Sequence, residues 1–231
     1  MKIIDDKSKK TTWYNRNYFF AGTLIIIAVN ILLFHFLGYK WTHDFAVING
    51  DQTPVWDRLL FFDNVIRQFM NSFAHLDWSH VIWNMVIMLV LGLYIERKTG
   101  TFGFLLLELV MALFTSWIVG AGRMGVNWVG HSCICYGFDA YVIVDYCFSF
   151  QKNKRNMFNT IFGAVVLGIV VVSFFWGDFP RIYPGKLVNN LGHYTGFVAG
   201  LVFSLTLQLT DLFVRKRTLS ELKEDTNESN R

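Results

Sequence analysis

The segment Gly-His-Ser-Cys-Ile-Cys-Tyr-Gly, residues 130–137, opens an apolar stretch of the chain and carries a hydroxyl, Ser132, near its start. A second apolar stretch carries Asn-Leu-Gly-His-Tyr-Thr-Gly, residues 190–196, with an imidazole at His193. A polar side chain surrounded by hydrocarbon is costly unless it has a polar partner, and ionisable groups at membrane depth are commonly functional. The simplest partnership joins these two groups, which would make a nucleophile and its general base inside a membrane.

The composition of the chain also indicates a membrane protein. Of 231 residues, 53% are hydrophobic and 16% are charged, against about 25% charged residues in soluble domains. The formal charge of +4 does not imply nucleic-acid binding, because the basic residues lie at the chain ends and in loops. We therefore expect an all-α, polytopic membrane protein whose partner is the lipid bilayer, with no nucleic acid and no cofactor.

Six apolar stretches approach or reach the length of about 20 residues that a helix needs to cross a bilayer. The chain shows no linker and no convincing internal repeat between them. The sequence therefore predicts one six-helix membrane domain over 18–214, between an N-terminal segment, 1–17, and a C-terminal tail, 215–231. Within that tail, residues 218–231 are expected to be solvated and partly disordered. The predicted spans are about 18–37, 79–95, 102–119, 131–150, 158–176 and 188–214.

The distribution of lysine and arginine predicts the orientation of these helices. One side of the predicted membrane domain carries the basic clusters, and the other carries few basic residues in a much longer loop. Because cytoplasmic loops are enriched in Lys and Arg, both termini are predicted to be cytoplasmic. The first apolar stretch is long enough to span and no small-x-small cleavage site follows it, so we expect a retained helix. The size and six-helix core suit a bacterial plasma membrane.

Ser132 is predicted to lie in the first turn of a helix, just after Gly130, which lets the chain turn sharply. Backbone amides in a first turn have no acceptor within the helix and can stabilise an anion, so an oxyanion donor would lie beside the hydroxyl. Tyr136, one turn later, is expected to pack against the imidazole. The alternative is a packing serine that bonds back to its own helix, which is common in membranes.

His193 adjoins a row of glycines, Gly192, Gly196 and Gly200, whose spacing makes a smooth helix face. Such a face lets another helix approach closely. If it packs on the helix of Ser132, the imidazole can reach the hydroxyl and act as a general base. An intramembrane histidine can instead be a proton relay or a structural hydrogen bonder, and both interpretations stay open.

A third polar group has the spacing His-x4-His-x3-Asn and consists of His75, His80 and Asn84. Residues 80 and 84 share one helix face, and their ring and amide N–H groups suit a developing oxyanion. His75 is expected to brace the loop before this helix. Two histidines and an asparagine could instead bind zinc, but asparagine is a poor zinc ligand and no carboxylate lies at helical spacing, so no metal is expected.

Several acidic residues lie within or beside the predicted spans, and Glu96, Glu108, Asp139 and Asp145 are four of them. Glu96 is expected to bind the amides at the start of the helix that follows it. Glu108 lies in the middle of a predicted span and has no evident partner. Asp139 is predicted to be too deep to orient His193 and to make an interhelical hydrogen bond or line a water pocket. Asp145 should approach the cytoplasmic interface.

These motifs together resemble the rhomboid family of intramembrane serine proteases. The family pattern has Gly-x-Ser-Gly with a tyrosine four residues after the serine, His-x4-His-x3-Asn on the second helix, and a histidine followed by spaced glycines on the sixth. Its Glu-x3-Gly is matched by Glu96 and Gly100, and of its Trp-Arg pair only Arg67 is present, because Ile66 replaces the tryptophan. The resemblance covers about residues 67–201 and departs at Cys133, where the family has glycine.

The resemblance implies a serine endopeptidase with a dyad of Ser132 and His193 and no acidic third member. It implies single-pass membrane proteins as substrates, cut within their transmembrane segments, and a movable cap over the site at 177–187. Two other functions stay open: a catalytically silent relative that binds membrane helices, favoured by Cys133, and a small proton channel or transporter. The sequence does not fix the oligomeric state. The implied oxyanion donors are the Ser132 amide, His80 and Asn84, and the implied supporting residues are His75, Gly130, Tyr136 and Gly196.

Overall fold

A computed structural model describes residues 20–45, 69–121, 130–153, 157–177 and 190–229. Within these ranges the chain is all-helical, as the sequence predicts. The predicted N-terminal segment, much of the long first loop with Arg67, and residues 178–187 of the predicted cap lie outside the described part of the chain. The helices are α1 (Ala21–Phe45), α4 (Trp78–Ala121), α5 (Ser132–Asn153), α6 (Met157–Gly177) and α7 (Asn190–Ser229).

Helix α4 consists of two helical parts that meet at Gly100. This residue has φ of 74° and ψ of 166°, a backbone conformation that glycine adopts without steric cost. Each part has about 21 residues, and at 1.5 Å per residue it extends about 30 Å, which is the thickness of a bilayer core. The two parts contain the predicted spans 79–95 and 102–119.

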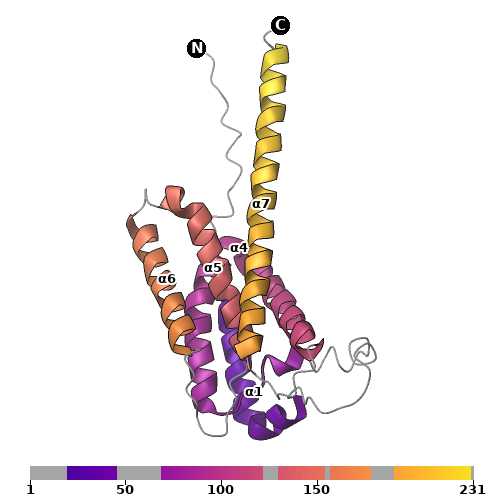
Figure 1. Ribbon diagram of the computed structural model, residues 1–231, viewed down its shortest axis with the longest axis vertical. Helices are drawn as coiled ribbons and strands as arrows, with labels where there is room; N and C mark the ends of the chain where they lie inside the picture. The colour runs from indigo at the N-terminus through magenta and orange to yellow at the C-terminus, as the bar shows by residue number, and fades with distance from the viewer. Residues whose placement is uncertain (1–19, 46–68, 122–129, 154–156, 178–189, 230–231) are drawn as a thin grey trace.

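Three helical stretches of the described residues are long and apolar enough to cross a membrane. They are Ala21–Gly38, Trp78–Thr115 and Gly192–Phe213, and Thr160–Val172 is a shorter apolar helix. Helix α5 lies at the centre, in contact with α4, α6 and α7, while α1 packs on α4 (Figure 1). The chain is therefore a multi-pass helical membrane protein.

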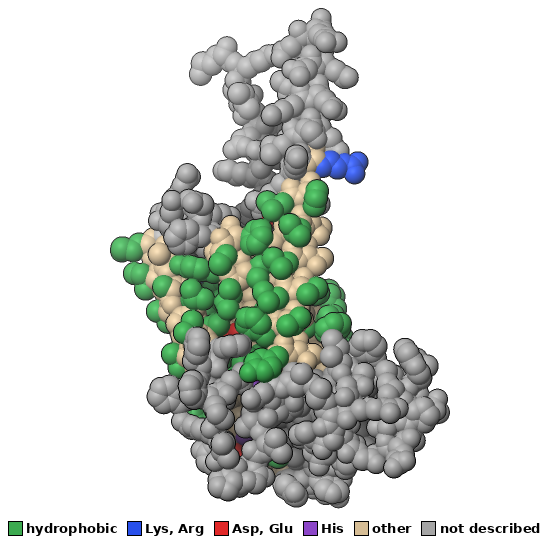
Figure 2. Space-filling view, in the orientation of Figure 1, with side chains coloured by type: hydrophobic (Ala, Val, Ile, Leu, Met, Phe, Trp, Pro, Cys, Tyr) green, Lys and Arg blue, Asp and Glu red, His purple; other side chains and the backbone are tan. Residues whose placement is uncertain are grey.

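The outer surface of the bundle is apolar. The side chain of Phe102 is 81% exposed and that of Phe36 is 75% exposed. Figure 2 shows hydrophobic side chains over the visible face of α5, α6 and α7. In contrast, four carboxylates inside the helices are at most 4% exposed: those of Glu96, Glu108, Asp139 and Asp145. A soluble protein has the opposite distribution, so lipid is the solvent that this surface suits.

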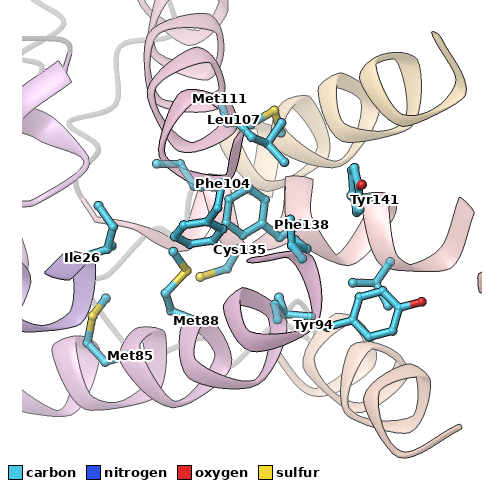
Figure 3. Packing of buried hydrophobic residues seen from close by; sticks show 14 of the residues in the cluster. Ile26, Met85, Met88, Tyr94, Phe104, Leu107, Met111, Cys135, Phe138 and Tyr141 are labelled. Carbon is cyan, nitrogen blue, oxygen red and sulfur yellow. The ribbon is translucent and has the colours of Figure 1, made fainter. Parts of the chain in front are cut away.

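The apolar core lies where α4 and α5 face each other (Figure 3). The rings of Phe104 and Phe138 pack there with centroids 5.7 Å apart. Met88 and Met111 belong to the same buried cluster, and all four side chains are at most 2% exposed. This contact fixes α5, and with it Ser132 at its N-terminal end, relative to both parts of α4.

Glu96 joins α1 to α4. Its carboxylate accepts hydrogen bonds from the backbone N–H of Gly22 at 2.9 Å and of Thr23 at 2.8 Å. The hydroxyls of Thr23 and Thr101 also donate to it, at 2.7 Å and 2.6 Å. The expectation that Glu96 binds amides of the following helix is therefore wrong. The amides belong to α1, because the first turn of α1 lies beside the end of the first part of α4, and unpaired amides in a first turn attract a carboxylate.

Helix α7 continues as far as Ser229 and projects beyond the other helices of the bundle (Figure 1). The expectation of a partly disordered tail is therefore wrong for residues 218–229. The segment 219–224, Leu-Ser-Glu-Leu-Lys-Glu, is rich in residues with high helix propensity. These residues allow the apolar helix to continue into its polar end.

Candidate active site

Ser132 and His193 are brought together at the N-terminal ends of two helices. Ser132 is the first residue of α5, and His193 lies in the first turn of α7. Nε2 of the imidazole lies 2.9 Å from Oγ of the hydroxyl, which is hydrogen-bond distance. Both residues are partly exposed, so the pair is accessible from outside the bundle. A proton can pass directly from oxygen to nitrogen in this arrangement.

The close approach of α5 and α7 makes this contact possible. A Cβ on Gly196 would lie 2.0 Å from the carbonyl oxygen of Cys133, and one on Gly200 would lie 2.0 Å from that of Gly137. Any larger residue at these positions would force the two helices apart. Gly196 is one turn from His193, so the same close packing sets the distance between the imidazole and the hydroxyl.

Tyr136 lies flat against the imidazole of His193. The two ring centroids are 4.3 Å apart, with 11° between the ring planes. The tyrosine is 6% exposed, so the surrounding core holds it in place. A fixed aromatic face of this kind restricts the ring orientation of His193 and keeps Nε2 directed at the hydroxyl.

His80 and Asn84 lie beside the turn that precedes Ser132. Gly130 in this turn has φ of +113°, and a Cβ there would lie 2.8 Å from Nε2 of His80 and 3.5 Å from Nδ2 of Asn84. Nδ2 of Asn84 is buried and has no hydrogen-bond partner among the described residues. Two side-chain nitrogens therefore face the same turn, and one of them is a donor without an acceptor.

The neighbours of His80 indicate which nitrogen carries its proton. Its backbone N–H donates to Oδ1 of Asp77 at 2.8 Å, which caps the start of α4. Its Nδ1 accepts from the backbone N–H of Leu76 in a long contact of 3.5 Å. If Nδ1 accepts, the proton of the neutral ring is on Nε2, the atom beside Gly130. His80 is therefore oriented as a hydrogen-bond donor toward this turn.

His75 lies behind His80 and is fully buried. Its Nδ1 lies 3.3 Å from the carbonyl oxygen of Phe73, and its ring contacts that of His80 with centroids 5.0 Å apart. Burial, together with the neighbouring histidines His80 and His131, lowers the pKa of His75 from 6.5 to about 2. A neutral imidazole in this place supports the ring of His80.

Sequence reasoning missed one polar contact at the site, which joins His131 to Glu108. Nε2 of His131 lies 3.0 Å from Oε1 of Glu108, and the two side chains are 0% and 3% exposed. This contact supplies the partner of Glu108 that the sequence did not reveal. Two features of the sequence could have indicated this contact: Glu108 is an acid in the middle of a predicted span, and His131 is next to the candidate nucleophile.

A second polar cluster joins the same helices away from the serine. Asp145 on α5 accepts hydrogen bonds from the hydroxyl of Tyr94 at 2.7 Å and from Nε2 of Gln208 at 3.0 Å, and it pairs with Lys98. These partners belong to α4 and α7. Asp145 therefore ties together the three helices whose other ends carry the candidate site.

The described residues contain no group of three or more His, Cys, Asp or Glu side chains that could hold a metal ion. Cys133 and Cys135 are buried, Cys147 is exposed, and none of the three is joined to another by a disulfide. Asp139 is buried two turns further along α5 than Ser132. The polar groups described above beside the hydroxyl are the imidazole of His193 and the nitrogens of His80 and Asn84, which suit acyl transfer.

Comparison with known proteins covers the same part of the chain. Residues 63–209 match the family model of the Rhomboid domain. The chain is 25% identical over 179 residues to the Rhomboid protease GlpG of Salmonella choleraesuis (strain SC-B67) and to that of Salmonella paratyphi A (strain ATCC 9150 / SARB42). Each alignment covers 73% of this chain and 59% of the relative. The chain therefore spans about three fifths of the length of these curated relatives.

Proposed function

The chain belongs to the rhomboid family, and we propose that it is an intramembrane serine protease that cuts peptide bonds of membrane-protein substrates. The observation that carries this proposal is the 2.9 Å contact between His193 and Ser132, at a partly exposed position of an apolar bundle. The relatives named Rhomboid protease support it at the level of the family. Two helix N-termini, a stacked tyrosine and two further donor nitrogens surround this contact.

In the first step, Oγ of Ser132 attacks the carbonyl carbon of the scissile peptide bond. Nε2 of His193 takes the hydroxyl proton as the new C–O bond forms, so the imidazole becomes an imidazolium. Tyr136, stacked on the ring, keeps Nε2 aligned during the transfer and offers its π face to the positive charge. No third, acidic residue is part of this proposal.

The negative oxygen of the tetrahedral intermediate is stabilised by three donors in this proposal. They are the backbone N–H of Ser132, Nε2–H of His80 and the amide Nδ2–H of Asn84. The two side-chain donors lie beside Gly130, and an N–H in the first turn of α5 has no acceptor within its own helix. Donors that are already in place need little reorganisation as the charge develops.

The intermediate collapses when the C–N bond breaks. His193 returns its proton to the leaving amine, and the substrate's acyl group stays on Ser132 as an ester. Water then attacks the acyl carbon of this ester as His193 accepts a proton from it. The bond between this carbon and Oγ of Ser132 breaks, His193 returns the proton to Oγ, and the carboxylic acid product leaves. The partial exposure of both dyad residues supports the entry of water to this site.

We further propose that the membrane domain extends over 18–214 and crosses the bilayer six times. The six spans are α1, the two parts of α4, α5, α6 and α7. The long apolar stretches support four of these spans and Thr160–Val172 supports a fifth. With six spans and basic clusters on one side, both termini lie in the cytoplasm and the dyad lies toward the opposite face. The substrates are single-pass transmembrane segments.

Reconstitution with candidate substrates tests this function. The purified full chain and a set of single-pass reporter proteins are placed in liposomes, and cleavage products are mapped by mass spectrometry. We expect cleavage within a transmembrane segment by the wild type and none by Ser132→Ala or His193→Ala. Normal turnover by either variant would contradict the dyad. Stable reporter binding without cleavage indicates the silent relative, and proton flux that survives Ser132→Ala indicates a channel.

A further inference from the structure

Glu108 and His131 take no part in the proton transfers proposed above, yet they lie directly behind the nucleophile. His131 is the residue before Ser132 in the chain, and Glu108 reaches it from the second part of α4. Their side chains meet at 3.0 Å and are almost completely buried. A carboxyl group in such a place is costly, so its retention calls for a physical reason.

The imidazole of His131 contacts two separate parts of the structure. Its Nε2 meets the carboxyl of Glu108, and its Nδ1 lies 3.3 Å from the carbonyl oxygen of Ser72. The adjacent Gly130 donates its backbone N–H to the carbonyl oxygen of Asn71 at 3.1 Å. The two residues before Ser132 are therefore held on one side by the segment 71–72 and on the other by α4.

The backbone of His131 also begins helix α5. Its carbonyl oxygen accepts from the backbone N–H groups of Ile134 at 3.0 Å and of Cys135 at 3.1 Å. A displacement of His131 would therefore move the first turn of α5, including the hydroxyl and the amide of Ser132. Misplacement of a reacting group by about 1 Å can cost on the order of 10²-fold in rate.

We propose that Glu108 is a positioning residue that acts through His131 to hold the nucleophile and its amide in place. This inference rests on the proposed serine protease function. The carboxyl keeps the imidazole oriented toward Ser72, and the imidazole keeps the turn at Gly130 against the donors of His80 and Asn84. Glu108 itself touches neither the dyad nor the substrate in this account.

The chemistry of the contact predicts which substitution is tolerated. The carboxyl and the imidazole are 3.0 Å apart without the geometry of a hydrogen bond, so the contact joins two buried polar groups by proximity alone. We therefore expect a polar side chain of the same shape to replace the carboxyl. In Glu108→Gln, the amide can donate to Nε2 of His131 while Nδ1–H still donates to Ser72. In Glu108→Leu, the imidazole has no partner at Nε2 and is free to turn.

The test is the rate at which a fluorophosphonate probe labels Ser132 in the purified full chain, per folded molecule and well below each unfolding temperature. We expect Glu108→Leu to lower this rate about tenfold or more and Glu108→Gln to stay within about threefold of the wild type. Rescue by glutamine distinguishes positioning from a general packing role. The matched control is Glu96, the buried carboxylate between α1 and α4. Glu96→Leu should lower the unfolding temperature and leave the labelling rate per folded molecule unchanged.

His131→Phe provides a second route to the same test, because an aromatic ring is kept while both nitrogen contacts are lost. Its labelling rate should fall as far as that of Glu108→Leu, and the double variant should be no slower than the slower single variant. Wild-type rates in folded Glu108→Leu or His131→Phe, or fully additive losses, would overturn the inference and leave the protease proposal intact. Absence of labelling in the wild type would instead overturn the proposed function, and this inference with it.

Discussion

At the scale of single residues, Asn84 shows most clearly how the site is prepared for a ligand. Its Nδ2 is buried and has no acceptor among the described residues, which is unfavourable in a resting protein. The position beside Gly130 gives this donor a use, because an oxyanion formed at Ser132 would provide the missing acceptor. Asn84 is therefore expected to contribute to the rate of the chemical step rather than to stability.

Replacement of Asn84 tests this expectation. Loss of one oxyanion donor typically lowers kcat by about 10²–10³-fold, and we expect this for Asn84→Ala in the reporter cleavage assay. Asn30 is the matched control, because it is also buried but donates to the carbonyl oxygen of Ile26 in its own helix. Asn30→Ala should leave kcat unchanged. If Asn84→Ala also kept the wild-type kcat, Asn84 would not be an oxyanion donor.

The burial of His75 predicts how stability depends on pH. In the folded protein burial lowers its pKa to about 2, and an unfolded chain has the ordinary value of 6.5. Between these values the unfolded state binds a proton that the folded state excludes. The stability that neutral His75 supports is thus present above pH 6.5 and is lost as pH falls below it, by up to about 1.4 kcal/mol for each unit.

Unfolding in detergent at several pH values measures this effect. The wild type should lose stability more steeply between pH 7 and about pH 5 than His75→Gln, which has no imidazole to protonate. The difference between the two slopes removes the contribution of carboxylates that both proteins share. Equal slopes would show that the imidazole of His75 is hydrated or protonated in the folded protein.

Motif spacing in the sequence was enough to propose Ser132, His193, His80 and Asn84. The spacing works because polar residues are rare in apolar helices, so each one stands out. The contact between Glu108 and His131 could not be predicted in this way. It depends on how α4 and α5 pack, and the residues between these helices carry no pattern that sets that packing.

At the scale of helices, the packing of α5 on α7 brings His193 to Ser132, the pair that we propose as the dyad. The backbones touch along Gly196 and Gly200, where no Cβ fits. Apolar length predicted these helices, and the glycine row predicted a close contact. The partner of Glu96 was wrongly predicted, because the carboxylate of Glu96 accepts hydrogen bonds from the first turn of α1. The order of helices along the chain does not show which helix ends are neighbours in space.

Substitution of one glycine by alanine tests the role of this packing. In Gly196→Ala, the new Cβ would lie 2.0 Å from the carbonyl oxygen of Cys133, so α7 must move away from α5. We expect activity to fall on the order of 10²-fold or more, because the imidazole moves with its helix. Gly168 on α6 is the control, since a Cβ there meets nothing within 4 Å.

Gly168→Ala should keep full activity and raise stability by up to about 1 kcal/mol, as alanine favours the helix. Both variants are compared by reporter cleavage and by thermal unfolding. Full activity in Gly196→Ala would mean that the close approach of α5 and α7 is not needed for the function.

At the scale of the whole molecule, the chain has an apolar exterior and an apolar core that also contains buried carboxylates. Exposed aromatic side chains such as Phe102 face outward, while buried carboxylates such as Glu96 and Asp145 join the helices from within. Composition alone predicted this class of protein. The path of the chain across the bilayer depends on the break at Gly100, which divides α4 into two parts.

Cysteine labelling tests the proposed crossing of α4. In a chain with Cys147 replaced by serine, we expect Ser79→Cys to react with a membrane-impermeant maleimide in intact cells. Arg97→Cys should react only after the membrane is permeabilised, because it lies at the other end of the first part of α4, on the proposed cytoplasmic side. Labelling of both positions in intact cells would contradict a transmembrane orientation of this helix.

The most direct test of the central claim is labelling of the purified wild-type chain with a fluorophosphonate probe, followed by mass spectrometry of the labelled peptide. We expect a single modified residue, Ser132, and loss of labelling in both Ser132→Ala and His193→Ala, because the hydroxyl reacts only when the imidazole takes its proton. A folded wild type that does not react, or a His193→Ala variant that reacts at the wild-type rate, would contradict the claim that these two residues form a catalytic pair.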